Sequence, residues 1–356
     1  MITRELEKPS EAPSASQGWR AELARAVREP AELLHRLALP GELLPAARAA
    51  AASFPLLVPP SYLARIRPGD PQDPLLLQVL PLGQELEPGA GYGPDPLDEA
   101  AAKGGRGLLH KYHGRVLLIT TGACAVHCRY CFRRHFPYQQ EQLGGRQGRE
   151  ALEYIAADSS VEEVILSGGD PLALPDEVLA SLVGEIVAIP HVKRLRLHTR
   201  LPVVLPARVD RQLLAWLGAV PLPTVVVIHA NHPQEIDGVV AAALGRLRAS
   251  GALLLNQAVL LAGVNDRAAT LAELSKRLFA AGVLPYYLNL LDRVAGAAHF
   301  EVALDTARAL MAELAATLPG YLVPKLVREV PGSPAKVPQS FALAGSGPLE
   351  EGSRSG

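Results

Sequence analysis

The chain has 356 residues, of which 49% are hydrophobic, so it can bury a sizeable core. Its 35 Lys plus Arg residues nearly balance its 36 Asp plus Glu residues, which excludes a global basic field that would recruit nucleic acid. No apolar run is long enough to span a membrane, and the polar N-terminus lacks the apolar stretch of a secretory signal, so we expect a cytoplasmic protein.

The first 105 residues are predicted to precede the main domain as an extension. Residues 1–16 are rich in Ser, Pro and charge, which is typical of a disordered segment. Helical spacing of apolar residues, interrupted by prolines, predicts helices within 17–52. Residues 53–105 are rich in Pro and Gly, and we expect them to wrap the main domain irregularly. The range 17–105 is therefore predicted to be a helical and irregular extension without a core of its own.

Residues 106–320 alternate between strand-like and helix-like patterns. Short apolar runs predict strands at 116–120, 161–169, 192–199, 224–230, 252–260 and 284–291. Helical patterns occupy 147–157, 176–188, 208–217, 235–249, 267–280 and 303–316. Such alternation is typical of a parallel sheet of βα units, and six units indicate an α/β fold that is a partial, open version of the eight-unit TIM barrel.

The C-terminal residues form a strand-like segment and a tail. The strand-like YLVPKLV (321–327) opens a 321–340 segment that ends in a Gly- and Pro-rich stretch, and residues 341–356 are predicted to be disordered. Lys336 lies in this stretch, where a lysine is usually a solvated surface charge. If the tail folds back over the barrel mouth, the amine of Lys336 can instead form a Schiff base with pyridoxal phosphate.

All three cysteines fall in CAVHCRYC (124–131), an odd and tightly spaced set that favours metal or redox chemistry over disulfides. Four thiolates saturate a four-iron cluster, whereas three leave one iron open. S-adenosylmethionine can chelate that iron through its amino and carboxylate groups. The alternatives are a zinc site completed by a nearby His, or three buried thiols; a ferredoxin would need a fourth cysteine. Cys124, Cys128 and Cys131 are therefore predicted to hold a radical-generating cluster.

Further polar residues follow the predicted strands, at the end where βα barrels place their active sites. Residues 167–170 (SGGD) alone are typical of an ordinary turn, but beside the cysteine loop we interpret them as a binding site for the methionyl amino group. Arg133 and Arg134 suit a carboxylate or a phosphate, or form a solvated pair. His229 follows the fourth strand, where a lone His is often a core residue.

Six motifs, in this order, resemble the lysine 2,3-aminomutase family of radical S-adenosylmethionine enzymes: CAVHCRYCFRR, LSGGDPL, TRLPVVLP, HANHPQEI, NQAVLLAGVND and PYYLNLLD. The resemblance runs from about residue 70 to residue 340. KYHGRVLL (111–118) and the short cysteine-free tail are most similar to the branch that serves β-lysylation of elongation factor P. That branch isomerises (S)-α-lysine to (R)-β-lysine, which a ligase then attaches to the factor.

The resemblance also implies roles for individual residues. The [4Fe-4S] cluster is held by Cys124, Cys128 and Cys131, and pyridoxal 5′-phosphate is bonded by Lys336, with its phosphate held by Lys111, Tyr112 and Arg115. S-adenosylmethionine is surrounded by Ser167, Gly168, Gly169, Asp170, His229 and Gln257. The substrate carboxylate is bound by Arg133, and the ε-ammonium by Asp292 and Glu329. Lys111 stands where catabolic relatives have arginine, and Glu329 where they have aspartate. The zinc-binding cysteines of the clostridial enzymes have no counterpart, so zinc is not expected.

The predicted function is thus an isomerase that acts on L-lysine, takes electrons from a flavodoxin- or ferredoxin-like reductant and binds neither nucleic acid nor membrane. One alternative is a catabolic lysine 2,3-aminomutase acting on free lysine. A mutase for another amino acid, such as glutamate, is disfavoured by the acidic pair Asp292 and Glu329. A non-enzymatic zinc or RNA-binding module is disfavoured by the neutral net charge.

Overall fold

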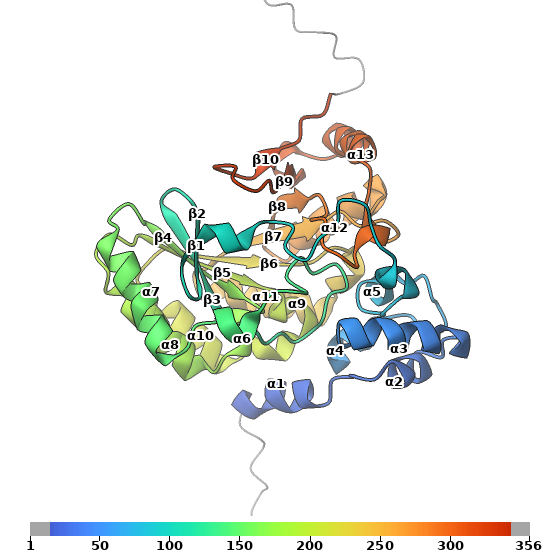
Figure 1. Ribbon diagram of the computed structural model, residues 1–356, viewed down its shortest axis with the longest axis horizontal. Helices are drawn as coiled ribbons and strands as arrows, with labels where there is room; N and C mark the ends of the chain where they lie inside the picture. Colours follow the sequence, from blue (N-terminus) through green and yellow to red (C-terminus); the bar gives the residue numbers. More distant parts are fainter. Residues whose placement is uncertain (1–14, 343–356) are drawn as a thin grey trace, which may run out of the picture.

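A single ten-stranded sheet, whose strands follow one another in chain order, organises the computed structural model, which describes residues 15–342 (Figure 1). The strands are β1 (Lys103–Gly105), β2 (Leu108–Tyr112), β3 (Arg115–Thr121), β4 (Glu163–Gly168), β5 (Arg194–Thr199), β6 (Thr224–Ile228), β7 (Leu253–Val259), β8 (Leu284–Asn289), β9 (Lys325–Arg328) and β10 (Val337–Pro338). Strands β3 to β9 run parallel to one another, whereas β1 and β2 at one edge and β10 at the other are added antiparallel. The predicted partial (β/α)6 barrel corresponds to β3–β8 and is confirmed.

Long helices connect the parallel strands and bury one face against them. They are α7 (Gly145–Ala157), α8 (Asp176–Val187), α10 (Arg211–Gly218), α11 (Gly238–Ala249), α12 (Ala268–Ala280) and α13 (Leu304–Thr317). In α8, Leu179, Val183 and Ile186 recur at helical spacing and are all buried. Strand β4 is buried at every position, as expected of a parallel strand covered on both faces. Within residues 15–342, no helix combines the length and the apolarity that crossing a membrane requires.

The N-terminal extension packs into the same core as the barrel. Its helices are α1 (Ala15–Ala24), α2 (Pro30–Arg36), α3 (Leu44–Ser53), α4 (Pro60–Leu63) and α5 (Pro74–Leu77), with 3-10 turns η1 (Gly41–Leu43), η2 (Gly83–Leu86) and η3 (Glu99–Ala102). Trp19, Val27 and Tyr62 belong to one hydrophobic cluster with Val164 of β4 and Leu197 of β5. The segment expected to be irregular, 53–105, contains two short α-helices, α4 and α5. Both begin at a proline, a residue that breaks a helix in its interior but is well tolerated in its first turn.

Shorter elements complete the loops at the mouth of the barrel. They are α6 (Tyr138–Glu141), α9 (Leu201–Val204), η4 (Pro171–Ala173), η5 (Pro206–Arg208), η6 (Pro233–Glu235), η7 (Ala298–Phe300) and η8 (Gly320–Leu322). The disordered ends predicted for 1–16 and 341–356 lie outside the described residues, apart from 15–16, which begin α1, and 341–342.

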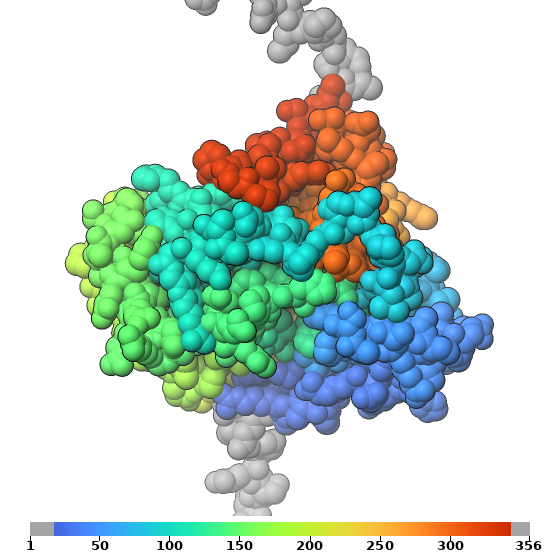
Figure 2. Space-filling view, viewed as in Figure 1, coloured from blue at the N-terminus to red at the C-terminus, as the bar shows by residue number. Residues whose placement is uncertain are grey.

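The C-terminal segment folds back over the barrel mouth. Strand β9 extends the parallel sheet next to β8, and β10 returns antiparallel to β9, directly after Lys336. Figure 2 shows this segment, in red, lying against the segment that precedes β3. The two are joined by an ion pair, in which Lys111 Nζ of β2 lies 3.2 Å from Glu329 Oε1. The segment that precedes β3 and the C-terminal segment therefore meet at the barrel mouth.

Candidate active site

A cavity of about 470 Å³ lies at the C-terminal ends of the parallel strands. Its size is typical of a small-molecule site, and its place in the barrel is that of βα active sites. Every residue to which the sequence assigned a role lines it: Lys111, Tyr112, Arg115, Cys124, Cys128, Cys131, Arg133, Ser167, Gly168, Gly169, Asp170, His229, Gln257, Asp292, Glu329 and Lys336. Residues more than 200 positions apart in the chain thus share one wall, as Lys111 and Lys336 do.

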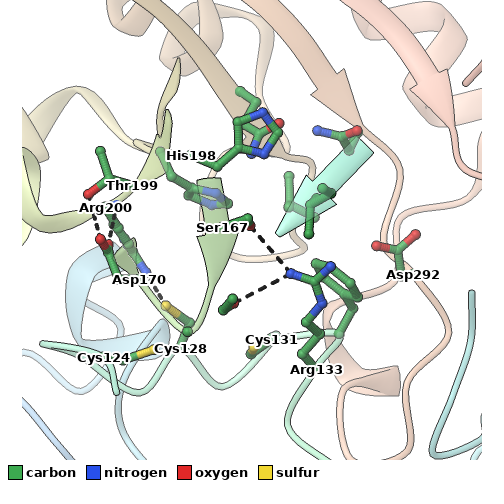
Figure 3. Close-up of a pocket in the computed structure, with 18 of the residues that line it drawn as sticks. Cys124, Cys128, Cys131, Arg133, Ser167, Asp170, His198, Thr199, Arg200 and Asp292 are labelled. Carbon is green, nitrogen blue, oxygen red and sulfur yellow. Dashed lines mark hydrogen bonds between the residues drawn. The ribbon is translucent and has the colours of Figure 1, made fainter. Parts of the chain in front are cut away.

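The three cysteines lie on the loop that follows β3, and each is partly buried (Figure 3). Burial, followed by the neighbouring thiols, raises the pKa of Cys131 to about 11, and the same causes raise the pKa of Cys124. Thiols this close cannot all ionise without a compensating cation, which iron supplies. All three cysteines line the cavity, and in a four-iron cluster each thiolate binds a different iron.

Beside the cysteine loop, the end of β4 exposes bare backbone to the cavity. Gly168 has a φ of +122°, and a Cβ there would lie 2.5 Å from the carbonyl oxygen of Thr121. Only glycine permits this approach of β4 to the end of β3, from which the cysteine loop starts. The backbone of Gly168 and Gly169 therefore lines the cavity without side chains and leaves room for a ligand.

Asp170 is committed to the fold in this structure. Its Oδ1 accepts hydrogen bonds from Leu172 N (3.0 Å) and Thr199 Oγ1 (2.7 Å), and its Oδ2 accepts from Arg200 N (2.7 Å). The carboxylate thus caps η4 and ties the β4 loop to the end of β5. Burial raises the pKa of Asp170 to about 6, although these hydrogen bonds favour its ionised form.

Arg133 faces the cavity with one end of its guanidinium and is paired at the other. Its Nε and Nη2 donate to the two carboxylate oxygens of Glu99, at 2.7 and 2.8 Å. Its Nη1 makes only long contacts, at 3.5 Å to Ser167 Oγ and 3.4 Å to Gly168 O (Figure 3). Glu99, a residue of η3, also lies 3.4 Å from Lys111 Nζ. This bidentate pair fixes the fork of Arg133 and leaves Nη1 as the group that can meet an anionic ligand.

Lys336 lies with Lys111 and Glu329 at one side of the cavity. Its Nζ donates to Asn289 Oδ1 at 2.8 Å and lies 3.1 Å from Glu329 Oε2. Burial opposes ionisation of Glu329, but Lys336 and Lys111 outweigh it and lower the pKa of this carboxyl to about 2. Glu329 therefore forms ion pairs with two lysines that lie more than 200 positions apart in the chain. An amine held in this way, with Lys111 and Arg115 in the same wall, fits a phosphate-bearing aldehyde such as pyridoxal phosphate.

Asp292 is the second carboxyl on this side, and it lies across the cavity from Arg200 and the cysteines (Figure 3). Burial raises the pKa of Asp292 to about 7; the Lys336 cation opposes this shift and the Glu329 anion adds to it. The cavity thus contains a cationic Arg133 and two acidic side chains, Asp292 and Glu329. Ion pairs through Glu99 and Lys111 join Arg133 to Glu329.

The floor of the cavity carries neutral polar groups. The rings of His229 and Tyr130 stack with centroids 5.7 Å apart, and His229 Nε2 lies 3.1 Å from the Tyr130 hydroxyl. Burial lowers the pKa of His229 to about 3, so its ring is neutral at pH 7. Gln257 of β7 lines the same floor.

Three further residues of the cavity wall, to which the sequence-based prediction gave no role, contact the predicted site residues. Glu99 and Asn289 hold Arg133 and Lys336, and Arg200 donates to Cys128 Sγ. Glu99 is 34 positions from Arg133 and lies in a segment expected to be irregular, so no spacing pattern links the two. For Arg200 a signal existed, because it follows the third predicted strand at the barrel mouth.

Comparison with known proteins agrees with this geometry. Residues 118–249 match the family model described as Radical SAM superfamily. An L-lysine 2,3-aminomutase of Escherichia coli K12 is 49% identical over 92% of this chain and 96% of its own length. The Haemophilus influenzae enzyme of the same name is 47% identical, over 90% and 95%. The Clostridium subterminale enzyme is 34% identical, over 95% and 82%.

Enzymes with this combination of features are isomerases that use a four-iron cluster, S-adenosylmethionine and pyridoxal phosphate. The three thiols, the bare glycine backbone and the partly buried Lys336 fit these groups in turn. The near-complete coverage of relatives at almost half identity extends the similarity to the whole chain. The chain therefore belongs to the lysine 2,3-aminomutase family of radical S-adenosylmethionine enzymes.

Proposed function

We propose that this enzyme converts (S)-α-lysine to (R)-β-lysine in the cytoplasm and supplies the product to a ligase that modifies elongation factor P. The observation that carries the proposal is that one cavity holds both Arg133, whose Nη1 makes only long contacts, and the buried carboxyl of Asp292. An amino acid with a second, cationic amine has a group to match each of these side chains. The names of the Escherichia coli and Haemophilus influenzae relatives support the same substrate.

When bound, the cluster and S-adenosylmethionine supply an organic radical, and pyridoxal phosphate supplies the group on which the amino group migrates. The protein contributes placement. In the proposal, Nη1 of Arg133 binds the α-carboxylate, Asp292 binds the ε-ammonium, and Lys111 and Arg115 hold the phosphate. Ionised Glu329 keeps Lys336 Nζ directed into the cavity. The buried walls exclude water, which protects a radical from side reactions.

The decisive experiment is turnover by the reconstituted protein. The enzyme is loaded anaerobically with iron, sulfide, pyridoxal phosphate and S-adenosylmethionine, and is then given lysine and a chemical reductant. We expect β-lysine, identified by mass spectrometry after chiral derivatisation. Absence of β-lysine, with both the cluster and pyridoxal phosphate bound, would contradict the proposed substrate, and the same assay with other amino acids would then find the true one.

Lys336→Ala should abolish both the pyridoxal absorbance bound to the protein and the turnover, because it removes the amine that Asn289 and Glu329 hold in the cavity. Lys325→Ala is the matched control, since Lys325 is exposed on the neighbouring strand β9 and should leave both signals unchanged. Persistence of the pyridoxal band in Lys336→Ala would show that another residue bonds the cofactor.

The pathway requires a separate test in cells. Deleting the gene should lower the mass of elongation factor P by the added β-lysine. A different result would assign the enzyme to lysine catabolism. In that case elongation factor P has the mass of the unmodified protein in both the parent and the deleted strain, and free β-lysine is lost only from the deleted strain.

A further inference from the structure

The side chain of Arg200 touches the cysteine loop. Its Nη1 lies 2.6 Å from Cys128 Sγ, and Figure 3 shows the guanidinium reaching the sulfur from the end of β5. Among the hydrogen bonds of the described residues, this is the only one that a charged side chain donates to a cysteine sulfur. Cys128 therefore differs from Cys124 and Cys131 in its electrostatic surroundings.

Arg200 is held rigidly in this position. Its Nη2 donates to Gln78 Oε1 at 2.7 Å and to Glu235 Oε2 at 2.9 Å, and its backbone N donates to Asp170 Oδ2. The rings of Tyr62 and Tyr130 each lie with their centroid 5.6 Å from the guanidinium carbon. An arginine with this many buried partners cannot turn away from the sulfur without leaving a carboxylate unpaired.

Glu235 belongs to the same buried unit. It is fully buried, and its other oxygen accepts hydrogen bonds from Asn231 N (2.8 Å) and Gln78 Nε2 (3.2 Å). Burial opposes ionisation of Glu235, but Arg200 and the hydrogen bonds to the carboxylate outweigh it and lower its pKa, so the pair is ionic. Cys128 thus faces one cation, which is itself partly offset by one anion behind it.

We propose that Arg200 is a positioning residue of the iron–sulfur centre that sets its reduction potential through the hydrogen bond to Cys128 Sγ. One electron from an external reductant adds one negative charge to the cluster and its thiolates, and no bond is formed or broken. A cation that donates to a ligand sulfur stabilises the more negative, reduced state and raises the potential. Glu235 acts in the opposite direction. The proposal rests on the cluster and not on lysine as substrate.

The test is a redox titration of the reconstituted cluster, followed by electron paramagnetic resonance in the absence of lysine. Arg200→Gln should lower the midpoint potential, with about a tenfold loss in the equilibrium constant for reduction, or about 59 mV for one electron. Glu235→Gln should raise it, because the anion that offsets Arg200 is removed. Arg200→Lys keeps the charge and should stay closer to the unaltered enzyme than Arg200→Gln.

Arg208→Gln is the matched control. Arg208 is an equally buried arginine, ion-paired to Asp176 at 2.8 Å, and makes no contact with a cysteine, so it should leave the potential unchanged. A shift in Arg200→Gln no larger than that in Arg208→Gln would overturn the proposal. If Arg200→Gln fails to bind the cluster, Glu235→Gln decides, since an unchanged or lower potential there would also overturn it. Either result leaves the substrate assignment untouched, because turnover is not the readout.

Discussion

Among single residues, Glu99 has the clearest local consequence, since it holds both Arg133 and Lys111. Burial opposes the charge of Glu99, but Arg133 and then Lys111 lower the pKa of its carboxyl, so it is ionised at pH 7. A buried anion between two cations fixes their positions, so that in the proposed binding mode the substrate carboxylate meets an arginine that is already oriented.

Glu99→Gln should therefore raise KM for lysine by about tenfold, or about 1.4 kcal/mol, with a smaller change in kcat. The glutamine keeps an acceptor but loses the ionic, bidentate pair that fixes Arg133. Steady-state kinetics of the reconstituted enzyme measures this. Glu153→Gln, at an exposed position of α7, serves as the control. An unchanged KM in Glu99→Gln would mean that Arg133 needs no such support.

Asp292 gives a prediction about pH. Because burial raises its pKa to about 7, the carboxyl is neutral below that pH and anionic above it. Lysine keeps its ε-ammonium throughout this range. We therefore expect kcat/KM for lysine to fall as the pH drops below about 7. Asp292→Asn should have a lower kcat/KM and no such fall, and a fall that persists in this variant would point to a different group.

At the scale of elements, the close approach of β4 to the cysteine loop depends on two glycines. A Cβ on Gly168 would meet Thr121 O, and a Cβ on Gly169 would meet Ala123 O. Both contacts are with backbone, which cannot move aside as a flexible side chain can. The register of β3 against β4 and the path of the cysteine loop are therefore coupled at this point.

Gly168→Ala should destabilise the fold by roughly 1–3 kcal/mol or more, because it adds a clash to a backbone conformation that alanine rarely adopts. Gly184→Ala in α8 is the opposite case: nothing lies within 4 Å of a Cβ there, and alanine should stabilise the helix by up to about 1 kcal/mol. Urea-induced unfolding followed by circular dichroism compares them. Equal midpoints for the two variants would contradict the proposed tightness of this contact.

Elements differ in how far sequence predicts them. The six barrel strands and their helices follow from local apolar patterns, because each buries a long, regular face. Strands β1 and β10 have three and two residues, too few to show a period, and they form only because a longer strand is already beside them. For the same reason the motifs indicated which residues share the cavity, but not that Glu99 pairs with Arg133 or Glu329 with Lys111, because such pairs depend on tertiary packing.

At the scale of the whole molecule, the extension is tied to the cysteine loop by a buried ionic cluster. Glu85 of η2 accepts hydrogen bonds from Arg129 at 2.8 and 2.5 Å and from Arg134 at 2.7 Å. All three side chains are at most 1% exposed. Arg129 and Arg134 flank Cys131, so the extension fixes the loop that is proposed to hold the cluster.

Glu85→Ala should cost about 3–5 kcal/mol, because it leaves two arginines buried without their anion. It should also lower the iron content after reconstitution, since the loop loses its anchor. Glu273→Gln breaks an exposed pair with Arg277, four residues further along α12, and should cost less than about 0.5 kcal/mol. Unfolding midpoints and iron assays test both variants, and full iron loading in Glu85→Ala would show that the loop holds its shape alone.

The chain-order sheet has a consequence for biosynthesis. Every strand pairs with the one made immediately before it, so the sheet can grow from β1 to β10 as the polypeptide is synthesised. The cysteine loop and the glycines at the end of β4 belong to the early part of this sequence, whereas Lys336 and β10 come last. The nascent protein can therefore shape its sulfur-lined wall well before the lysine wall exists. Lys336, the proposed covalent anchor of pyridoxal phosphate, is in place only when the final strands have been translated and have joined the sheet.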